Sequence, residues 1–180
     1  GYDGIAIANS NKGADFHLSL RDLYLALAKD IPADIDGKTV KPNPYKRWIE
    51  INPTYPDLPI VVYGPPPTSG TRDALNELGI ERGCKTYPER KKLKESNKKL
   101  YKSECRAIRT DGVYIEAGEN DNLIIEKLIT NPDSLGIFGY SFLDENRDKV
   151  KAATINGVSP EFELISNCLL YTSPSPRDRS

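Results

Sequence analysis

The stretch LPIVVYGPPPTSGTRDAL, residues 58–75, decides the fold class of this chain because it joins a strand pattern directly to a helix pattern. Residues 58–63 are a short β-branched run bounded by prolines, which is typical of a strand. Residues 72–79 place apolar side chains on one helical face. The small residues between the two runs therefore predict a tight turn in which a helix begins.

This turn carries donors that suit an oxyanion. A helix start presents free backbone N–H groups and the positive end of the helix dipole. Ser69 and Thr71 add hydroxyl groups, and Gly70 permits close approach to the backbone. Arg72 adds a charged fork that matches phosphate-like geometry. The four residues form a candidate anion site. The alternatives are that Ser69 or Thr71 is only an N-cap and that Arg72 points to solvent.

The rest of the chain alternates between strand and helix patterns. Further strands are expected at residues 4–9, 47–51, 112–117, 134–140 and 150–155, and further helices at 19–29 and 121–130, with one or two surface helices in 88–106. Ser19 and Asn120 are candidate N-caps, and Leu123, Ile124 and Leu128 are expected to face inward. This alternation predicts an α/β sandwich with a mainly parallel or mixed sheet.

The charge balance gives no general attraction to nucleic acid. The chain has 180 residues, of which 28% are charged, and a formal net charge of −1. Lysines concentrate in residues 91–102, but glutamates interrupt and flank the run and no aromatic platform accompanies it. We interpret this run as a solvated face and expect no nucleic-acid partner.

Residues that could support catalysis or bind a metal are few. Glu116, Glu119 and Asp121 flank Gly118 and could form a general-base pair or a metal site, but acids at a helix start more often stabilise the dipole. His17 is the single histidine and is expected at the surface. No nucleophile with an activating base can be assembled. We expect no catalytic residue, no metal and no cofactor.

Four separated segments agree, in order, with one known family. The SGT turn, GYDGIAIANS (1–10), YIEAGENDNLI (114–124) and LGIFGYSFL (135–143) together resemble the periplasmic phosphate-binding proteins of phosphate-specific ABC transporters, and the resemblance runs from residue 1 to about residue 166. It implies a three-layer α/β lobe of a two-lobed binding protein with a mixed, mostly parallel sheet. It also implies inorganic phosphate as ligand, a membrane permease as partner, a monomer and a periplasmic location.

The same resemblance implies a division of residues 1–167 into three parts, which a tail follows. Residues 1–9 would be a strand that crosses the hinge, and residues 10–134 would form the second lobe. Residues 135–167 would be the returning hinge segment and the start of the C-terminal part of the first lobe. We expect the two crossing segments to expose apolar strand edges. Residues 168–180 would be a non-native tail.

The chain departs from the family at one position. Many members have an arginine four residues before the serine of the turn, where this sequence has Pro65. If that arginine binds the anion in its relatives, this chain needs a substitute. Arg72, directly after Thr71, is the candidate.

With Cys168 assigned to the tail, two cysteines remain, Cys84 and Cys105. The resemblance implies an oxidising compartment, in which this pair forms a disulfide. The alternative is two free, half-buried thiols. Neither cysteine has the neighbours that a zinc site needs.

Both ends of the chain read as cut. There is no methionine and no signal-peptide pattern at the start. The end, CLLYTSPSPRDRS (168–180), resembles the translation of a sequencing adapter and is expected to pack against nothing.

The sequence therefore predicts an extracytoplasmic solute-binding protein that captures inorganic phosphate for uptake by an ABC transporter. A secreted phosphate-sensing or adhesion protein that uses the same lobe is the alternative from the same fold. An enzyme that acts on phosphate esters is a further alternative, but the catalytic groups that it needs are missing from the sequence.

Overall fold

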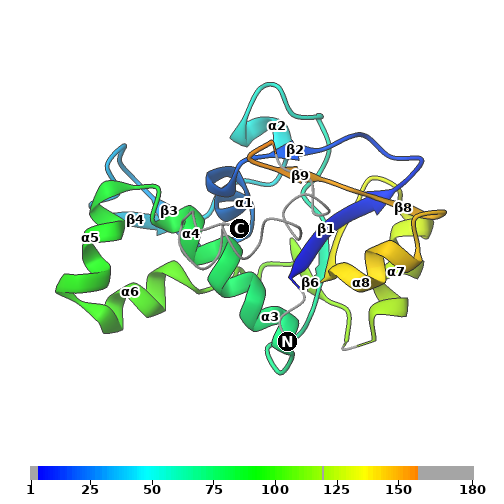
Figure 1. Ribbon diagram of the computed structural model, residues 1–180. Coiled ribbons are helices and arrows are strands. Elements are labelled where there is room, and N and C mark those ends of the chain that lie inside the picture. The colour runs from blue at the N-terminus through cyan, green and yellow to red at the C-terminus, as the bar shows by residue number, and fades with distance from the viewer. Residues whose placement is uncertain (1–3, 119, 158–180) are drawn as a thin grey trace.

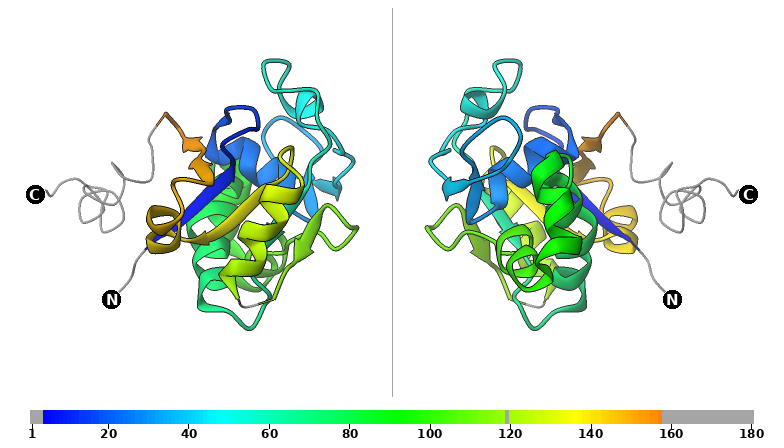
Figure 2. Two further views of the ribbon diagram at one scale, coloured as in Figure 1. Left: turned by 90° about the vertical axis from the view of Figure 1, so that its right-hand side faces the viewer. Right: turned by 90° about the vertical axis from the view of Figure 1, so that its left-hand side faces the viewer.

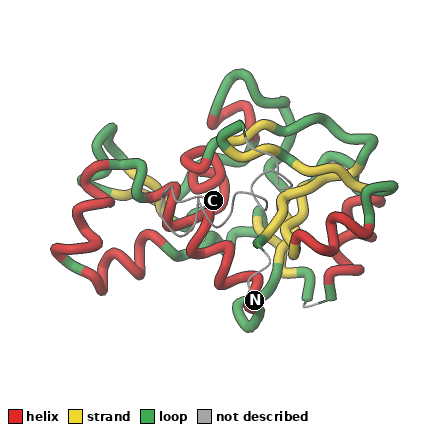
Figure 3. Tube along the Cα trace, in the orientation of Figure 1, coloured by secondary structure: helices red, strands yellow, loops and turns green. Residues whose placement is uncertain are grey.

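The computed structural model describes residues 4–118 and 120–157 (Figure 1). The strands are β1 (Ile5–Ser10), β2 (His17–Leu18), β3 (Asp30–Pro32), β4 (Val40–Pro42), β5 (Val62–Gly64), β6 (Tyr114–Glu116), β7 (Leu135–Gly139), β8 (Val150–Ala152) and β9 (Thr154–Ile155). The helices are α1 (Leu20–Leu27), α2 (Trp48–Ile51), α3 (Gly70–Leu75), the π-helical segment η1 (Asn76–Glu81), α4 (Arg82–Cys84), α5 (Pro88–Ser96), α6 (Lys98–Cys105), α7 (Asp121–Thr130) and α8 (Tyr140–Glu145). Figure 3 shows how these elements alternate along the chain.

A five-stranded sheet with the order β6-β5-β7-β1-β8 forms the centre of the fold. Strand β5 runs parallel to both β6 and β7, whereas β1 is antiparallel to both β7 and β8. Four of the five strands therefore run in one direction and β1 runs against them. This confirms the predicted α/β class with a mixed, mostly parallel sheet.

Helices cover both faces of this sheet, which gives three layers (Figures 1 and 2). Side chains alternate along a strand, so Ile7 of β1 and Ile137 of β7 point into one core together with residues of α1 and α3. Ala6, Ala8 and Phe138 point to the opposite side, into a second core with residues of α7 and α8. Among the described residues, no helix has both the length and the apolar character needed to cross a membrane.

Segments 4–9 and 135–142 were expected to have exposed strand edges, but their strands β1 and β7 lie inside the sheet, and residues 140–142 belong to α8. Strand β1 pairs with β7 through the register Ile5↔Gly139 to Ala8↔Gly136 and is bordered by β8 on its other side. The expectation of exposed apolar edges is therefore wrong for these strands, because each has a hydrogen-bonded neighbour on both sides. The proposed lobe boundaries themselves stay predictions.

The prediction of a strand at RWIEI, residues 47–51, is wrong, because Trp48–Ile51 forms the short helix α2. The Glu50 carboxylate accepts hydrogen bonds from the backbone N–H groups of Lys46 and Arg47 and closes the helix start. The Trp48 ring is fully buried and lies 5.5 Å from the ring of Phe16. A run of five residues is too short to distinguish the apolar period of a strand from that of a helix. Burial of the Trp48 indole favours the helix.

Two further expectations need correction. Leu123 was expected to face inward but is 45% exposed, and Ile125 is buried instead, together with Ile124 and Leu128. Residues 150–155 form two strands rather than one. Strand β8 pairs with β1 in the central sheet, whereas β9 pairs with β2 in a separate two-stranded sheet. A buried Ala153 lies between them and donates its N–H to the Ile7 carbonyl.

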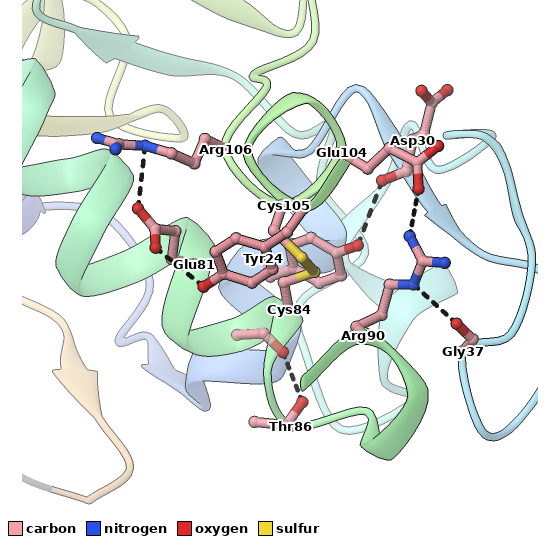
Figure 4. Close-up of a disulfide and its surroundings, with 12 residues drawn as sticks. Tyr24, Asp30, Gly37, Glu81, Cys84, Thr86, Arg90, Glu104, Cys105 and Arg106 are labelled. Carbon is pink, nitrogen blue, oxygen red and sulfur yellow. Dashed lines mark hydrogen bonds and ion pairs between the residues drawn. A yellow bond between two sulfur atoms is a disulfide. The ribbon is translucent and has the colours of Figure 1, made fainter. Parts of the chain in front are cut away.

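The predicted disulfide between Cys84 and Cys105 is present and joins α4 to α6 (Figure 4). Both cysteines are fully buried, and their Cα atoms are 5.5 Å apart. Polar contacts flank the bond, since Glu81 accepts from Tyr101 and pairs with Arg106 at 2.9 Å each. The disulfide therefore ties the α5–α6 hairpin to the rest of the domain.

Replacing Gly83 with alanine is expected to lower the free energy of unfolding by about 3 kcal/mol, the upper part of the overpacking range. A Cβ atom at Gly83 would overlap Tyr24 Cβ and the Leu20 carbonyl oxygen, so α4 could no longer pack closely on α1. Urea unfolding measures the loss. Gly139→Ala is the control, since no described atom lies within 4 Å of its Cβ position. Equal stabilities of the two variants would contradict the close approach of the two helices.

Candidate functional site

The turn that precedes α3 is a capped helix start, as the sequence predicts. Ser69 has an extended backbone and is the N-cap, and its Oγ accepts a hydrogen bond from Thr71 N at 3.0 Å. The Ser69 carbonyl accepts from Arg72 N at 3.1 Å. The expectation that all N–H groups of the turn are unpaired is therefore wrong. Within the described part of the chain, it is Gly70 whose N–H has no partner.

Gly70 lies at an exposed and uncrowded position. A Cβ atom at Gly70 would meet no described atom within 4 Å, and the residue is exposed. The helical backbone continues without a break from α3 through η1 to α4, because Leu75, Asn76, Glu81 and Arg82 all keep right-handed helical angles. The Gly70 donor thus lies at the positive end of a helical stretch longer than α3 alone.

The Arg72 side chain folds back over the turn rather than pointing to solvent. Its Nη1 donates to the Pro65 carbonyl at 3.1 Å and lies 3.7 Å from the Glu116 carboxylate. The side chain is 12% exposed, and the guanidinium carbon lies 5.1 Å from the centre of the Tyr114 ring. Its Nε is buried and has no hydrogen-bond partner among the described residues. A charged donor with an unused N–H therefore lies beside Pro65, the position where many family members have arginine.

Strand β6 holds the other side of the site. The register pairs Gly64 with Glu116, and the Tyr114 hydroxyl donates to the Pro65 carbonyl at 2.7 Å. A side chain at Gly64 would overlap the Tyr114 phenol, so glycine is required there. Burial raises the pKa of Tyr114 to about 12, which keeps the hydroxyl protonated and able to donate. This network fixes the carbonyl to which Arg72 is bound.

The site lies where the connections after β5 and β6 leave on opposite faces of the sheet. Leu75 of α3 packs in the core of one face, and Ile124 and Leu128 of α7 pack in the core of the other. In open α/β sheets, ligands bind at such a switch point beyond the carboxyl ends of the strands. Helix α7 also begins at this edge of the sheet, directly after β6. Its N-cap is Asn120, whose Oδ1 accepts a hydrogen bond from Asn122 N at 2.9 Å.

Of the remaining candidates, Asp121 and His17 have hydrogen-bond partners within the described part of the chain. Asp121 begins α7, where burial raises the pKa of its carboxyl group and a hydrogen bond from the backbone of Gly139 opposes that effect. His17 Nδ1 lies 3.0 Å from the Thr154 hydroxyl at the exposed β2–β9 pair. Glu119 lies outside the described residues. In residues 4–118 and 120–157 no group of three or more His, Cys, Asp or Glu side chains could hold a metal ion.

Sequence reasoning missed the contribution of Tyr114 and Glu116 to this site. The available signal was indirect, since Gly64 ends β5 directly before three prolines and an aromatic residue precedes Glu116 by two positions. Their meeting depends on the parallel register of β5 and β6, which connects residues about fifty positions apart.

Fold and site together define an α/β domain with a capped helix start at the switch point of a mostly parallel sheet. The chain belongs to the PBP superfamily domain family, whose model matches residues 1–172.

Relatives of known sequence and structure agree with this assignment. The chain is 27% identical over 153 residues to the phosphate-binding protein PstS of Staphylococcus epidermidis, covering 85% of this chain and 34% of that protein. It is 27% identical over 146 residues to the protein SphX of Synechococcus elongatus, covering 78% of this chain and 34% of SphX. The chain thus spans about a third of the length of these curated relatives.

Solved structures show the same fold. PstS from Borrelia burgdorferi superimposes with a TM-score of 0.60 at 18% identity, covering 92% of this chain and 52% of that one. An ABC-type phosphate transport receptor from Vibrio cholerae gives a TM-score of 0.56 at 17% identity, covering 92% of this chain and 51% of the receptor. The fold is therefore that of the periplasmic binding proteins.

Proposed function

We propose that this chain is the anion-binding part of an extracytoplasmic solute-binding protein that captures inorganic phosphate for an ABC transporter. The observation that carries the proposal is the unpartnered N–H of the exposed Gly70, two positions before Arg72, whose buried Nε also lacks a partner among the described residues. Two relatives named as a phosphate-binding protein and as a phosphate transport receptor support phosphate as the anion. The proposed site consists of Ser69, Gly70, Thr71 and Arg72.

The proposed chemistry is binding without bond cleavage. The Gly70 N–H and the hydroxyls of Ser69 and Thr71 donate to phosphate oxygens, and the Arg72 guanidinium supplies the opposite charge. Arg72 keeps its direction through the Pro65 carbonyl and so needs little reorganisation when the anion arrives. Its ion pair with Glu116 is long at 3.7 Å, so a phosphate oxygen can compete with the carboxylate for Nη1.

The proposed partner is the membrane permease of the transporter, and the proposed location is the periplasm. The family supports both, and the name of one structural relative, an ABC-type phosphate transport receptor, supports the permease as partner. In the two-lobed arrangement that the sequence resembles, the anion is enclosed from both sides. Water is then excluded and each charge-assisted hydrogen bond gains strength. We infer that this chain alone binds phosphate far more weakly than a complete two-lobed protein, with a dissociation constant above the micromolar range.

Arg72→Gln is expected to weaken phosphate binding by about tenfold or more, because a hydrogen bond from a charged donor contributes roughly 1.5 to 3 kcal/mol. Titration of phosphate into the ¹⁵N-labelled chain, followed by amide NMR shifts, measures the binding and locates it. We expect the largest shifts at Gly70, Thr71 and Arg72.

The matched control is Arg47→Gln, which removes the N-cap arginine of α2 from an exposed pair with Asp57 and should leave the titration unchanged. Shifts that are equal in both variants, or that map to another part of the sheet, would exclude the proposed site. A micromolar or tighter constant would instead contradict the two-lobed enclosure.

A further inference from the structure

The junction of α4 and α5 lies away from the turn that precedes α3 (Figure 1). A surface cavity of about 360 Å³ opens there and is lined by Lys85, Lys91, Lys92, Lys94 and Glu95. We call it the lysine pocket. Lys85 follows the last residue of α4, and the others project from α5, so the turn at residues 85–87 brings the ammonium groups together.

Glu95 lines the pocket and brings one negative charge to it, whereas two nearby carboxylates are paired with arginines outside it. Glu104 is paired with the buried Arg90, and Glu81 is paired with Arg106. Glu89 pairs with Lys92 at 3.3 Å. Lys85, Lys91 and Lys94 have no ion pair within the described part of the chain. The pocket therefore keeps an excess of positive charge that the protein itself does not neutralise.

Both burial and neighbouring cations act on the Lys85 ammonium group. Burial lowers the pKa of the Lys85 ammonium group, and the positive charges of Lys94, Arg82 and Lys91 lower it further against the opposing effect of Glu81. Like charges held together on a partly buried surface raise the free energy of the empty pocket. A bound anion would remove that repulsion.

We propose that the lysine pocket is a second anion site that binds an extended polyanion of the inorganic oligophosphate class. Lysine ammonium groups are point charges on flexible stems, so they suit several charges spread along a ligand better than the fixed geometry of one oxyanion. The cavity is much larger than a single phosphate ion, which could contact only part of its rim. The pocket is distinct from the Ser69–Arg72 turn, so the proposal stands independently of the proposed function.

Tripolyphosphate is the probe, and the Arg72→Gln protein is the background, so that binding at the turn does not contribute. The combined variant Lys85→Gln, Lys91→Gln and Lys94→Gln is expected to weaken tripolyphosphate binding by about tenfold or more in calorimetric titration. The matched control replaces Lys98, Lys99 and Lys102 with glutamine, which removes the same charge from α6 at exposed positions outside the pocket. It should change the affinity by less than about threefold.

Two further measurements make the test decisive. Inorganic phosphate should bind the pocket at least about tenfold more weakly than tripolyphosphate, since it engages fewer lysines. The pair Lys91→Gln and Lys94→Gln, at exposed positions, repeats the test without changing the half-buried Lys85. Equal losses in the pocket and α6 variants, or equal affinities for the two anions, would overturn the proposal, and neither result bears on phosphate binding at the turn.

Discussion

Replacing Cys84 and Cys105 together with alanine is expected to lower the free energy of unfolding by about 3 kcal/mol. The two cysteines are 21 positions apart and close a loop that contains α5 and α6. In the chain-entropy model, opening a loop of this size raises the conformational entropy of the unfolded chain, which stabilises the unfolded state by that amount of free energy. For a chain of this length the loss corresponds to a fall of about 10 °C in melting temperature.

The hairpin depends on this bond because it has little apolar surface of its own. Of the residues in α5, Arg90 is buried, and in α6 the buried residues are Tyr101 and Cys105. Arg90 is held by the Gly37 carbonyl at 2.7 Å and by Glu104. These contacts orient the hairpin, but the disulfide is its covalent connection to α4.

Thermal unfolding of the double alanine variant, compared with the parent chain before and after reduction, measures the effect. Reduction of the parent should reproduce most of the loss, which separates the cross-link from the change of side chain. Hydrogen exchange should accelerate first in α5 and α6. An unchanged melting temperature would mean that the polar contacts around Arg90 hold the hairpin without the cross-link.

Asp111→Ala is expected to destabilise the fold by about 3 kcal/mol, at the lower end of the range for breaking a buried ion pair. Arg109 is 2% exposed and holds Asp111 through two hydrogen bonds of 2.9 and 2.8 Å, while its third contact is the Ala26 carbonyl. Without the carboxylate, a buried guanidinium keeps its charge with one acceptor. Partial exposure of Asp111 places the effect at the lower end.

The pH dependence gives this prediction a second test. The hydrogen bond from Arg109 holds the pKa of the Asp111 carboxyl well below its usual range, with Lys46 acting in the same direction. Because the folded pKa is lower than the unfolded one, the stabilisation is present above about pH 4 and is lost as the pH falls through the folded value. The parent and Asp111→Ala stabilities should therefore converge only in strong acid.

Two controls bracket the Asp111 effect in urea unfolding. Asp57→Ala breaks the exposed pair with Arg47 and should cost less than about 1 kcal/mol. Adding Arg109→Met to Asp111→Ala should recover part of the loss, since it removes the buried charge that was left without a partner. A double variant no more stable than the single one would show that the side chain of Arg109, rather than its charge, supports the core.

Local capping signals were readable because they act over a few residues. Ser19 and Ser69 accept hydrogen bonds from backbone N–H groups two or three positions ahead, and Asn120 does the same at the start of α7. These contacts form within one turn, so a sequence window contains both partners. The alternation of strands and helices was predictable for the same reason, and with it the fold class.

Long-range contacts decided what the sequence left open. Trp48 lies in a helix because its indole is buried against Phe16, and that contact overrides the strand pattern of a five-residue run. At the candidate site, the direction of Arg72 depends on the Pro65 carbonyl, which Tyr114 fixes from the neighbouring strand.

Neighbours along the chain therefore specify the fold class and the caps of α1, α3 and α7, which is why a local pattern could predict them. Only the tertiary structure decided which of the turn's donors stay free and where Arg72 points. It also decided that Lys85 and the lysines of α5 share one pocket. Those properties depend on strand register and on the path of the chain between helices, which bring together groups that a local pattern cannot connect.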